Sequence, residues 1–441
     1  MSTTGSGGDA RPHDVTVLLA LGADHDQVPA IEVARQLGHH VVAVDPDPEA
    51  PGMALADVTV TAELTDAGTV VAVAVEHHVG AVIPAPAERW LTTVGRVNDA
   101  LGLRGVSHAS ALACVDARRF HRRCQRAGVR RPEQLVAVDA AELATAIGQV
   151  GRPCLLRPAT GTEGEAVVVV GADDDVDALI AWHLADRPAG DETVVEPVLA
   201  GQQLGVDAAV VRGAIELVLL RTRELTPPPF RVPVADLAPA PADEARTLAV
   251  RRELQRVVQA LALTDCLLRA TVNVADDELV TVLGASACPA GDRVADTVVP
   301  TVTGVPYLEN GVRLVLGEEV LFAPARRAGA VRRRLWAPPG RVVRVGPPPK
   351  SAADPDVLVF SSPLAADQLL EPVATVADAA ARGTVVTRGV DAEAAARLAD
   401  RVVGELDVEV DPAGEPAADP LGDPHQLRSP RPPELSGTAA R

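Results

Sequence analysis

The residue types most suited to binding chemistry lie in a glycine-containing loop between two short apolar segments. Cys154–Leu156 and Ala166–Val170 have the pattern of strands, and residues 157–165 connect them. The connection contains Thr160, Gly161, Thr162 and Gly164. A loop of this kind between antiparallel strands can fold over phosphates and bind them through backbone N–H groups. Any hairpin connection also needs glycines, so the loop alone does not separate a phosphate site from an ordinary turn.

Two charged clusters have weaker claims to a site. Arg326, Arg327 and Arg332–Arg334 could hold an anionic substrate group, but a run of like charges usually lies on a solvated face, which is what we expect here. Asp276–Glu278 separates two strand-like segments. Acids in a hairpin turn normally face solvent, so we do not assign these three as metal ligands.

The elements that would position these residues alternate between strand and helix patterns, which predicts an α/β fold with a parallel sheet at its start. In the first hundred residues, strands are expected at Val15–Ala20, Val41–Val44 and Ala81–Ile83, and helices at Val28–Leu37, Val70–His78 and Glu88–Leu101. Further along, Ala109–Ala127 has the pattern of one long helix and Thr193–Glu196 that of a strand. Ala242–Leu263 is expected to be an amphipathic helix that buries Leu248, Leu254, Val258 and Leu261.

Length and composition limit the classes of function. A chain of 441 residues should divide into two to four domains. Sixty acidic residues against 41 basic ones give a net charge of -19, so we expect no nucleic-acid partner. No apolar run approaches the ~18 residues that span a bilayer, and the N-terminus lacks a signal-peptide core. The five cysteines have no zinc-site spacing, and we expect buried, reduced thiols and a cytoplasmic protein.

The order of these elements, and the residues that join them, resembles the ATP-grasp superfamily, and within it the carboxylate–amine and L-amino-acid ligases. The similarity runs over about residues 14–410. It is carried by Val44-Asp45-Pro46-Asp47, Leu101-Gly102-Leu103-Arg104-Gly105, Ala127-Gly128-Val129-Arg130-Arg131-Pro132, the segment 153–167, Val195-Glu196-Pro197-Val198-Leu199-Ala200-Gly201, and Gly383-Thr384-Val385-Val386 with Gly389. No single motif is specific, but their order matches that of the family.

The resemblance implies a domain plan. An α/β domain that precedes the grasp covers 14–106, the ATP-grasp domain covers 107–320 with a lid at about 132–200, and an α+β subdomain covers 321–410. Residues 1–13 and the proline-rich tail 411–441 have the composition of disordered segments.

The resemblance also implies an ATP site. The residues that match the family's nucleotide-binding positions are Arg157, Thr160, Gly161, Thr162, Gly164, Glu196, Val198 and Gln203. Two lysines neutralise phosphates in the family, and here Ala117 and Arg157 stand at those positions. Arginine keeps a permanent positive charge, whereas alanine contributes none, although Arg118 or Arg119 could reach in from the next turn.

The metal positions depart furthest from the family. The positions of two metal carboxylates and an asparagine align with Thr271, Gly284 and Ser286, and Cys288 replaces a catalytic arginine. Magnesium prefers anionic oxygen, usually carboxylate, so this donor set does not favour magnesium and we assign no metal ligand.

Two functions follow from the resemblance. The missing charges favour a pseudoenzyme, in which a grasp fold binds a ligand with weak or no turnover, because phosphoryl transfer depends on positioning and charge neutralisation. The alternative is an active ATP-dependent ligase that converts a small-molecule carboxylate into an acyl phosphate and transfers it to an amine. We assign no catalytic residue. The sequence is also compatible with a homodimer.

Overall fold

The computed structural model describes residues 15–86, 88–159, 167–185, 187, 190–325 and 327–412. The chain begins with a four-stranded parallel sheet in the order β3-β2-β1-β4. Its strands are β1 (Val17–Leu21), β2 (His40–Asp45), β3 (Val58–Thr61) and β4 (Ala81–Val82), and its helices are α1 (Val28–Gln36), α2 (Ala67–Glu76) and α3 (Leu91–Leu101).

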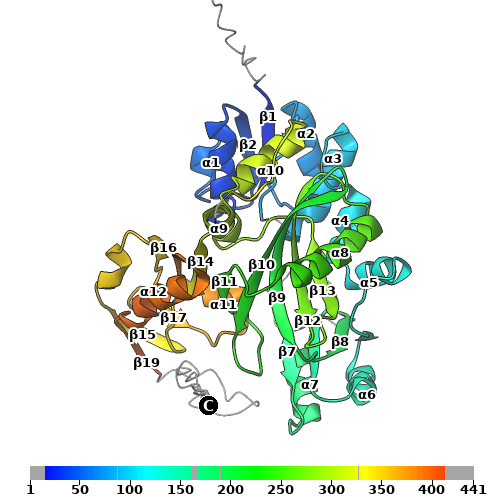
Figure 1. The fold of residues 1–441 in the computed structure, drawn as a ribbon, viewed down its shortest axis with the longest axis vertical. Helices are drawn as coiled ribbons and strands as arrows, with labels where there is room; N and C mark the ends of the chain where they lie inside the picture. The colour runs from blue at the N-terminus through cyan, green and yellow to red at the C-terminus, as the bar shows by residue number, and fades with distance from the viewer. Residues whose placement is uncertain are drawn as a thin grey trace, which may run out of the picture.

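Helices cover both faces of the parallel sheet, and alternate side chains of each strand point toward these opposite faces. Leu18 and Ala20 pack with α1, whereas Leu19 and Leu21 pack with α2 and α3. The first of these cores also includes Tyr307 and neighbouring apolar residues of α10 (Tyr307–Leu316). Figure 1 shows α10 beside α1, so a late helix attaches the first sheet to the rest of the molecule.

A second, antiparallel sheet forms the centre of the molecule. Its eight strands lie in the order β13-β12-β9-β10-β11-β14-β18-β16. Their bounds are β9 (Gln202–Val211), β10 (Ala214–Leu225), β11 (Pro233–Ala238), β12 (Cys266–Val274), β13 (Val280–Ser286), β14 (Gly329–Arg334), β16 (Val357–Ser361) and β18 (Thr384–Gly389). Helix α8 (Glu244–Leu261) covers one face through Val250, Leu254 and Val258.

The third layer, which we call the lid, is a small antiparallel sheet with the order β5-β8-β6-β7. It comprises β5 (Leu135–Ala137), α6 (Ala140–Val150), β6 (Cys154–Pro158), β7 (Val168–Val170), α7 (Val176–Leu184) and β8 (Thr193–Pro197). Its open edge is held by the segment after β10, because Arg231 N donates to Val167 O at 3.1 Å and Val169 N donates to Pro229 O at 2.7 Å.

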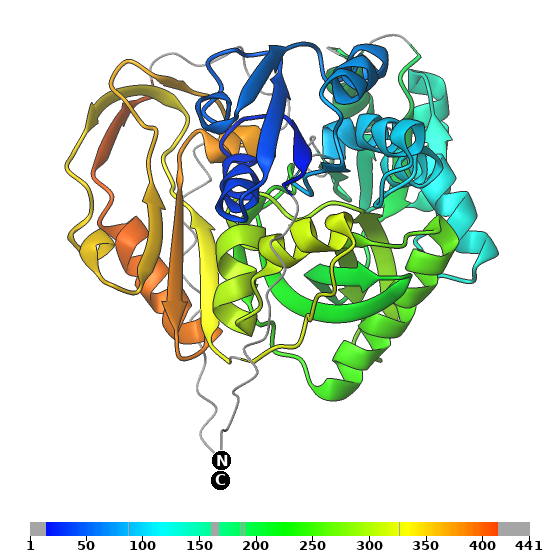
Figure 2. The same ribbon diagram turned by 90° about the horizontal axis from the view of Figure 1, so that it is seen from above.

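The C-terminal part does not form a separate sheet throughout. Strands β14, β16 and β18 extend the central sheet, so a boundary at residue 320 divides the chain but not the sheet. A three-stranded sheet, β17-β15-β19, lies at the periphery (Figures 1 and 2), and α12 packs on β14 and β18 of the central sheet. The remaining bounds are α9 (Val299–Thr303), β15 (Gly340–Val345), β17 (Leu369–Leu370), α11 (Val376–Ala380), α12 (Ala392–Gly404) and β19 (Val408–Asp411).

Two local predictions were wrong. The expected helix Ala109–Ala127 is two helices, α4 (His108–Val115) and α5 (Ala117–Arg126), because Asp116 is extended and its carboxylate caps α5 by accepting from Arg119 N. Leu248 is exposed instead of buried, and Val250 and Val257 complete the apolar face of α8. Within the described residues, no helix is both long enough and apolar enough to cross a bilayer.

Candidate functional site

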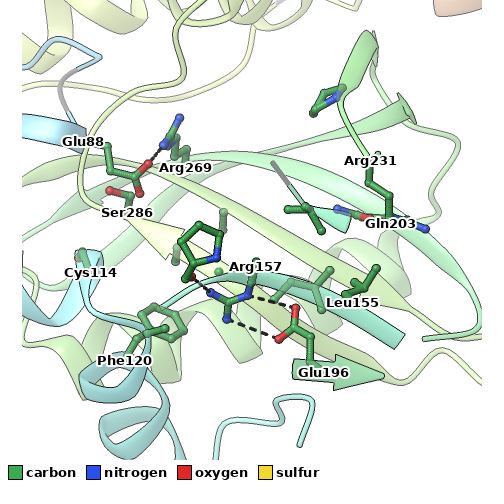
Figure 3. A pocket seen from close by; sticks show the side chains of 18 of the residues that line it. Glu88, Cys114, Phe120, Leu155, Arg157, Glu196, Gln203, Arg231, Arg269 and Ser286 are labelled. Carbon is green, nitrogen blue, oxygen red and sulfur yellow. Dashed lines mark hydrogen bonds and ion pairs between the residues drawn. The ribbon is translucent and has the colours of Figure 1, made fainter. Parts of the chain in front are cut away.

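A cavity lies between the lid and the central sheet (Figure 3). Strand β6 contributes Arg157 from the lid and β8 contributes Glu196. The central sheet contributes Gln203 from β9, together with side chains of β10, β12 and β13. The first turns of α5 close one end with Ala117 and Phe120.

Arg157 and Glu196 meet because β6 and β8 pair in antiparallel register. Leu155 is the backbone partner of Glu196, and Arg157 lies two residues further on the same face. Arg157 Nε lies 3.3 Å from Glu196 Oε1, and Gln134 Nε2 donates to Glu196 Oε2 at 2.8 Å. Two side chains, Arg157 and Gln134, therefore donate to the buried Glu196 carboxylate.

The structure brings together only part of the predicted nucleotide set. Arg157, Glu196 and Gln203 line the cavity, as does Ala117 at the lysine position. Val198 does not line it, and its backbone N–H donates to Pro153 O at 3.3 Å. The other four predicted residues, Thr160, Gly161, Thr162 and Gly164, lie outside the described residues.

Neither arginine proposed as a substitute for the lysine at Ala117 enters the cavity. Arg118 forms an ion pair with Glu192 at 2.9 Å, and Arg119 pairs with Asp116 at 3.0 Å. Both guanidinium groups are about half exposed, so the N-cap geometry of α5 directs them along the surface.

Two of the three aligned metal positions, Gly284 and Ser286, line the cavity, and Thr271 lies next to them in the sheet. Thr271 on β12 pairs with Gly284 on β13, beside a bulge in β13, and Ser286 follows on the same face. Thr271 Oγ1 accepts a hydrogen bond from Arg223 Nη1 at 3.0 Å, and Ser286 Oγ accepts one from Cys288 Sγ at 3.5 Å.

These residues do not fit a magnesium ion. They provide two hydroxyl groups, no carboxylate and a neighbouring guanidinium cation. Among the residues that the structure describes, no group of three or more His, Cys, Asp or Glu side chains could hold a metal. The turn acids Asp276–Glu278 are exposed at the end of the β12–β13 hairpin, and Glu278 pairs with Arg246.

The arginines that line the cavity are Arg131, Arg157, Arg223, Arg231 and Arg269. Of these, the sequence predicted only Arg157 as a site residue. Arg269 pairs with Glu88, and Arg223 lies 3.4 Å from Asp236. The spacing Arg221-x-Arg223 and Arg269-x-Thr271 puts both members of each pair on one strand face, and this alternation was the available signal.

Arg131 and Arg231 have different surroundings from the other three. Arg131 donates to the carbonyls of Val282 and Leu283 at the bulge and lies over the Phe120 ring, 4.4 Å from its centroid. Burial lowers the pKa of Arg131 to about 10 and also lowers the pKa of Arg231, whose Nη2 donates to Gln203 Oε1 at 3.0 Å.

A buried ion network continues from the cavity across the central sheet. Asp236 on β11 pairs with Arg221, Arg223 and Arg332, and Arg334 pairs with Asp292 at 2.7 Å. Burial opposes ionisation of Asp236, but the guanidinium groups of Arg221, Arg332 and Arg223 hold its pKa well below the usual range.

The prediction of a solvated face for Arg332–Arg334 was therefore wrong for two of the three residues. Arg332 and Arg334 are buried, because alternate residues of β14 face the network, and Arg333 points outward to Glu224 and Asp400. Arg327 is exposed, as predicted, and Arg326 lies outside the described residues.

Comparison with solved structures identifies this arrangement of three layers. An L-amino acid ligase from Bacillus licheniformis superposes with a TM-score of 0.75 and 17% identity, over 90% of this chain and 99% of that one. A phosphoribosylglycinamide synthetase from Anaerococcus prevotii gives 0.70 and 17%, over 90% and 100%. The chain has the ATP-grasp fold. An ATP-grasp neighbour solved with ADP, an N5-carboxyaminoimidazole synthetase from Staphylococcus aureus, gives 0.65 and 12%, over 88% of this chain and 98% of that one.

Sequence comparison gives shorter matches at higher sequence identity. A formate-dependent phosphoribosylglycinamide formyltransferase from Erythrobacter litoralis is 29% identical over 176 residues, which is 40% of this chain and 44% of the relative. The corresponding protein from Herminiimonas arsenicoxydans is 24% identical over 219 residues, 48% and 50% of the two chains. The chain thus matches half or less of the length of these curated relatives, and no protein-family model matches it.

Proposed function

We propose that the cavity between the lid and the central sheet binds an adenine nucleotide, and that the protein has weak or no ligase turnover. The carrying observation is the hydrogen bond from Arg223 to Thr271 at an aligned metal position. A phosphoryl transfer needs charge neutralisation around the transferred group. The replacement of metal carboxylates by Thr271 and Gly284 removes the ligands that would hold a magnesium ion there.

The nucleotide part of the proposal is supported by the joint position of Arg157, Glu196 and Gln203. An arginine and a glutamine amide can both donate to phosphate or ribose oxygens. The structures complexed with ADP among the ATP-grasp neighbours support the same type of ligand.

A second function, an active ATP-dependent carboxylate–amine ligase, is favoured by the relatives and neighbours, which are named as ligases, synthetases and a formyltransferase. In such an enzyme a carboxylate would receive the γ-phosphoryl group, and the amine would then displace phosphate from the acyl phosphate. The five cavity arginines could take over part of the charge neutralisation.

One experiment separates these functions. The full chain is titrated with ATP by calorimetry, and ADP release is then measured with Mg-ATP and a mixture of amino acids and formate. Saturable ATP binding with ADP release no faster than without protein supports the proposal. ADP release that depends on the carboxylate and is lost in Arg157→Ala establishes the second function, and an absence of ATP binding refutes both.

A further inference from the structure

The charged side chains that line the cavity carry a surplus of positive charge. Five are the arginines named above, and the two described carboxylates of the lining are Glu88 and Glu196. The whole chain, by contrast, has a net charge of -19. Local concentration of cations against the overall balance is the electrostatic arrangement of an anion site.

Two of these cations have no carboxylate in ion-pair contact among the residues that the structure describes. Arg231 donates to the Gln203 amide, and Arg131 donates to backbone carbonyls. Neutral acceptors compensate a desolvated guanidinium less completely than a carboxylate does. An anion that enters the cavity therefore gains attraction without first breaking an ion pair at either residue.

A third cation lies where the fold family implies a divalent metal. Arg223 Nη1 is 3.0 Å from Thr271 Oγ1, and Thr271 is the backbone partner of Gly284. Arg223 shares its counter-ion Asp236 with two other arginines, so its charge is only partly neutralised. Its guanidinium therefore still repels a second cation and offers N–H donors to phosphate oxygens. Relative to the family pattern, this position therefore differs in two ways: the metal-binding carboxylates are replaced, and the positively charged Arg223 lies beside Thr271.

We propose that the cavity binds a nucleoside polyphosphate as the metal-free anion, and that magnesium weakens this binding. This rests on the proposed function, because it assumes that the ligand is a nucleotide. Arg131, Arg223 and Arg231 supply the positive charge that a divalent cation brings elsewhere. Because magnesium neutralises part of the ligand charge, the complex is attracted less strongly to three fixed guanidinium groups.

The test is calorimetric titration of the full chain with ATP, in EDTA and in excess magnesium chloride, at matched ionic strength. We expect the Kd to rise roughly five-fold or more with magnesium. Equal or tighter binding with magnesium overturns the inference and leaves the proposed function intact. Inorganic tripolyphosphate is the second probe. If it binds without metal while ATP does not bind, the anion site stands and the nucleotide assignment fails; if neither binds, both fail.

A matched pair of variants tests the residues. Arg231→Gln removes one charge and retains the backbone hydrogen bond to Val167, so metal-free ATP should bind roughly ten-fold more weakly and the effect of magnesium should shrink. Arg388→Gln removes an exposed arginine that pairs with Asp356. It lies on β18, near the edge of the central sheet opposite β12 and β13, and the variant should bind ATP like the parent. Equal losses in both variants would mean that overall charge, not the cavity, determines affinity. An unchanged Kd in Arg231→Gln also overturns the assignment of this residue.

Discussion

Arg157 and Glu196 form an ion pair of 3.3 Å across the antiparallel strands β6 and β8, with the glutamate side chain only 8% exposed. Arg157→Ala leaves that carboxylate buried with Gln134 as its remaining side-chain donor. We expect the free energy of unfolding to fall by about 1–3 kcal/mol. Urea unfolding measures this, and Arg157→Lys should recover part of the loss. An alanine variant as stable as the parent would show that the pair contributes nothing to the lid.

Asp236 provides the second prediction, because it joins three arginines from β10 and β14. Asp236→Asn leaves these guanidinium groups without their shared counter-ion, so the free energy of unfolding should fall by about 3–5 kcal/mol. The matched control is Asp356→Asn, which removes a half-exposed partner of Arg388 and should cost about 0–1 kcal/mol. If both variants lost similar free energy of unfolding, the larger cost expected for the buried Asp236 would be wrong.

The third prediction concerns pH and His183 in the lid. Burial, with a contribution from Arg187, lowers the pKa of His183 to about 4, and its Nε2 lies 3.1 Å from Thr193 Oγ1. The unfolded chain protonates first on acidification, so stability is complete above about pH 6.5 and is lost as the pH falls toward 4. The full effect is roughly 3 kcal/mol.

Urea unfolding at several pH values from about 7 to about 4 tests that dependence. His183→Gln removes the titration and retains a hydrogen-bonding group, so its stability should vary less over this range. If parent and variant lose stability in parallel, another group is responsible for the acid sensitivity.

The fourth prediction concerns the vacated metal positions. Ala117→Lys, Thr271→Glu, Gly284→Glu and Ser286→Asn, combined with Arg223→Gln, should create a magnesium site. Two facing carboxylates repel each other without a cation, so this variant should be less stable than the parent, and Mg-ATP should raise its Tm. Scanning fluorimetry with and without magnesium measures both effects.

Gly284 permits this design. Its φ is not positive, and a Cβ built there has no atom within 4 Å. Gly284→Ala should therefore fold like the parent. If Gly284→Ala folds like the parent, and the variant with all five substitutions gains no stability from magnesium, then residues 271, 284 and 286 are not a vacated metal site.

The fold and one side of the site were predictable because their signals are local. Apolar runs and glycine stops indicated β1, β2 and α1, and the segment around Glu196 could be matched to a strand and its following turn. The arginine lining was not predictable in the same way, because Arg223, Arg269 and Thr271 meet only through the pairing of β10, β9 and β12. The break at Asp116 was missed because an N-cap aspartate inside a helical pattern also has the composition of a continuous helix.

Arg231 connects two properties that are usually measured separately. Its backbone N–H donates to Val167 at the edge of the lid, and its side chain lies in the cavity beside Gln203. A ligand that holds the guanidinium therefore also holds the lid edge, and lid opening must break both interactions. The amide of Val169, which donates to Pro229 at the same edge, reports lid opening through its hydrogen exchange. By thermodynamic reciprocity, the free energy by which the ligand stabilises the closed lid equals the free energy by which lid closure strengthens ligand binding.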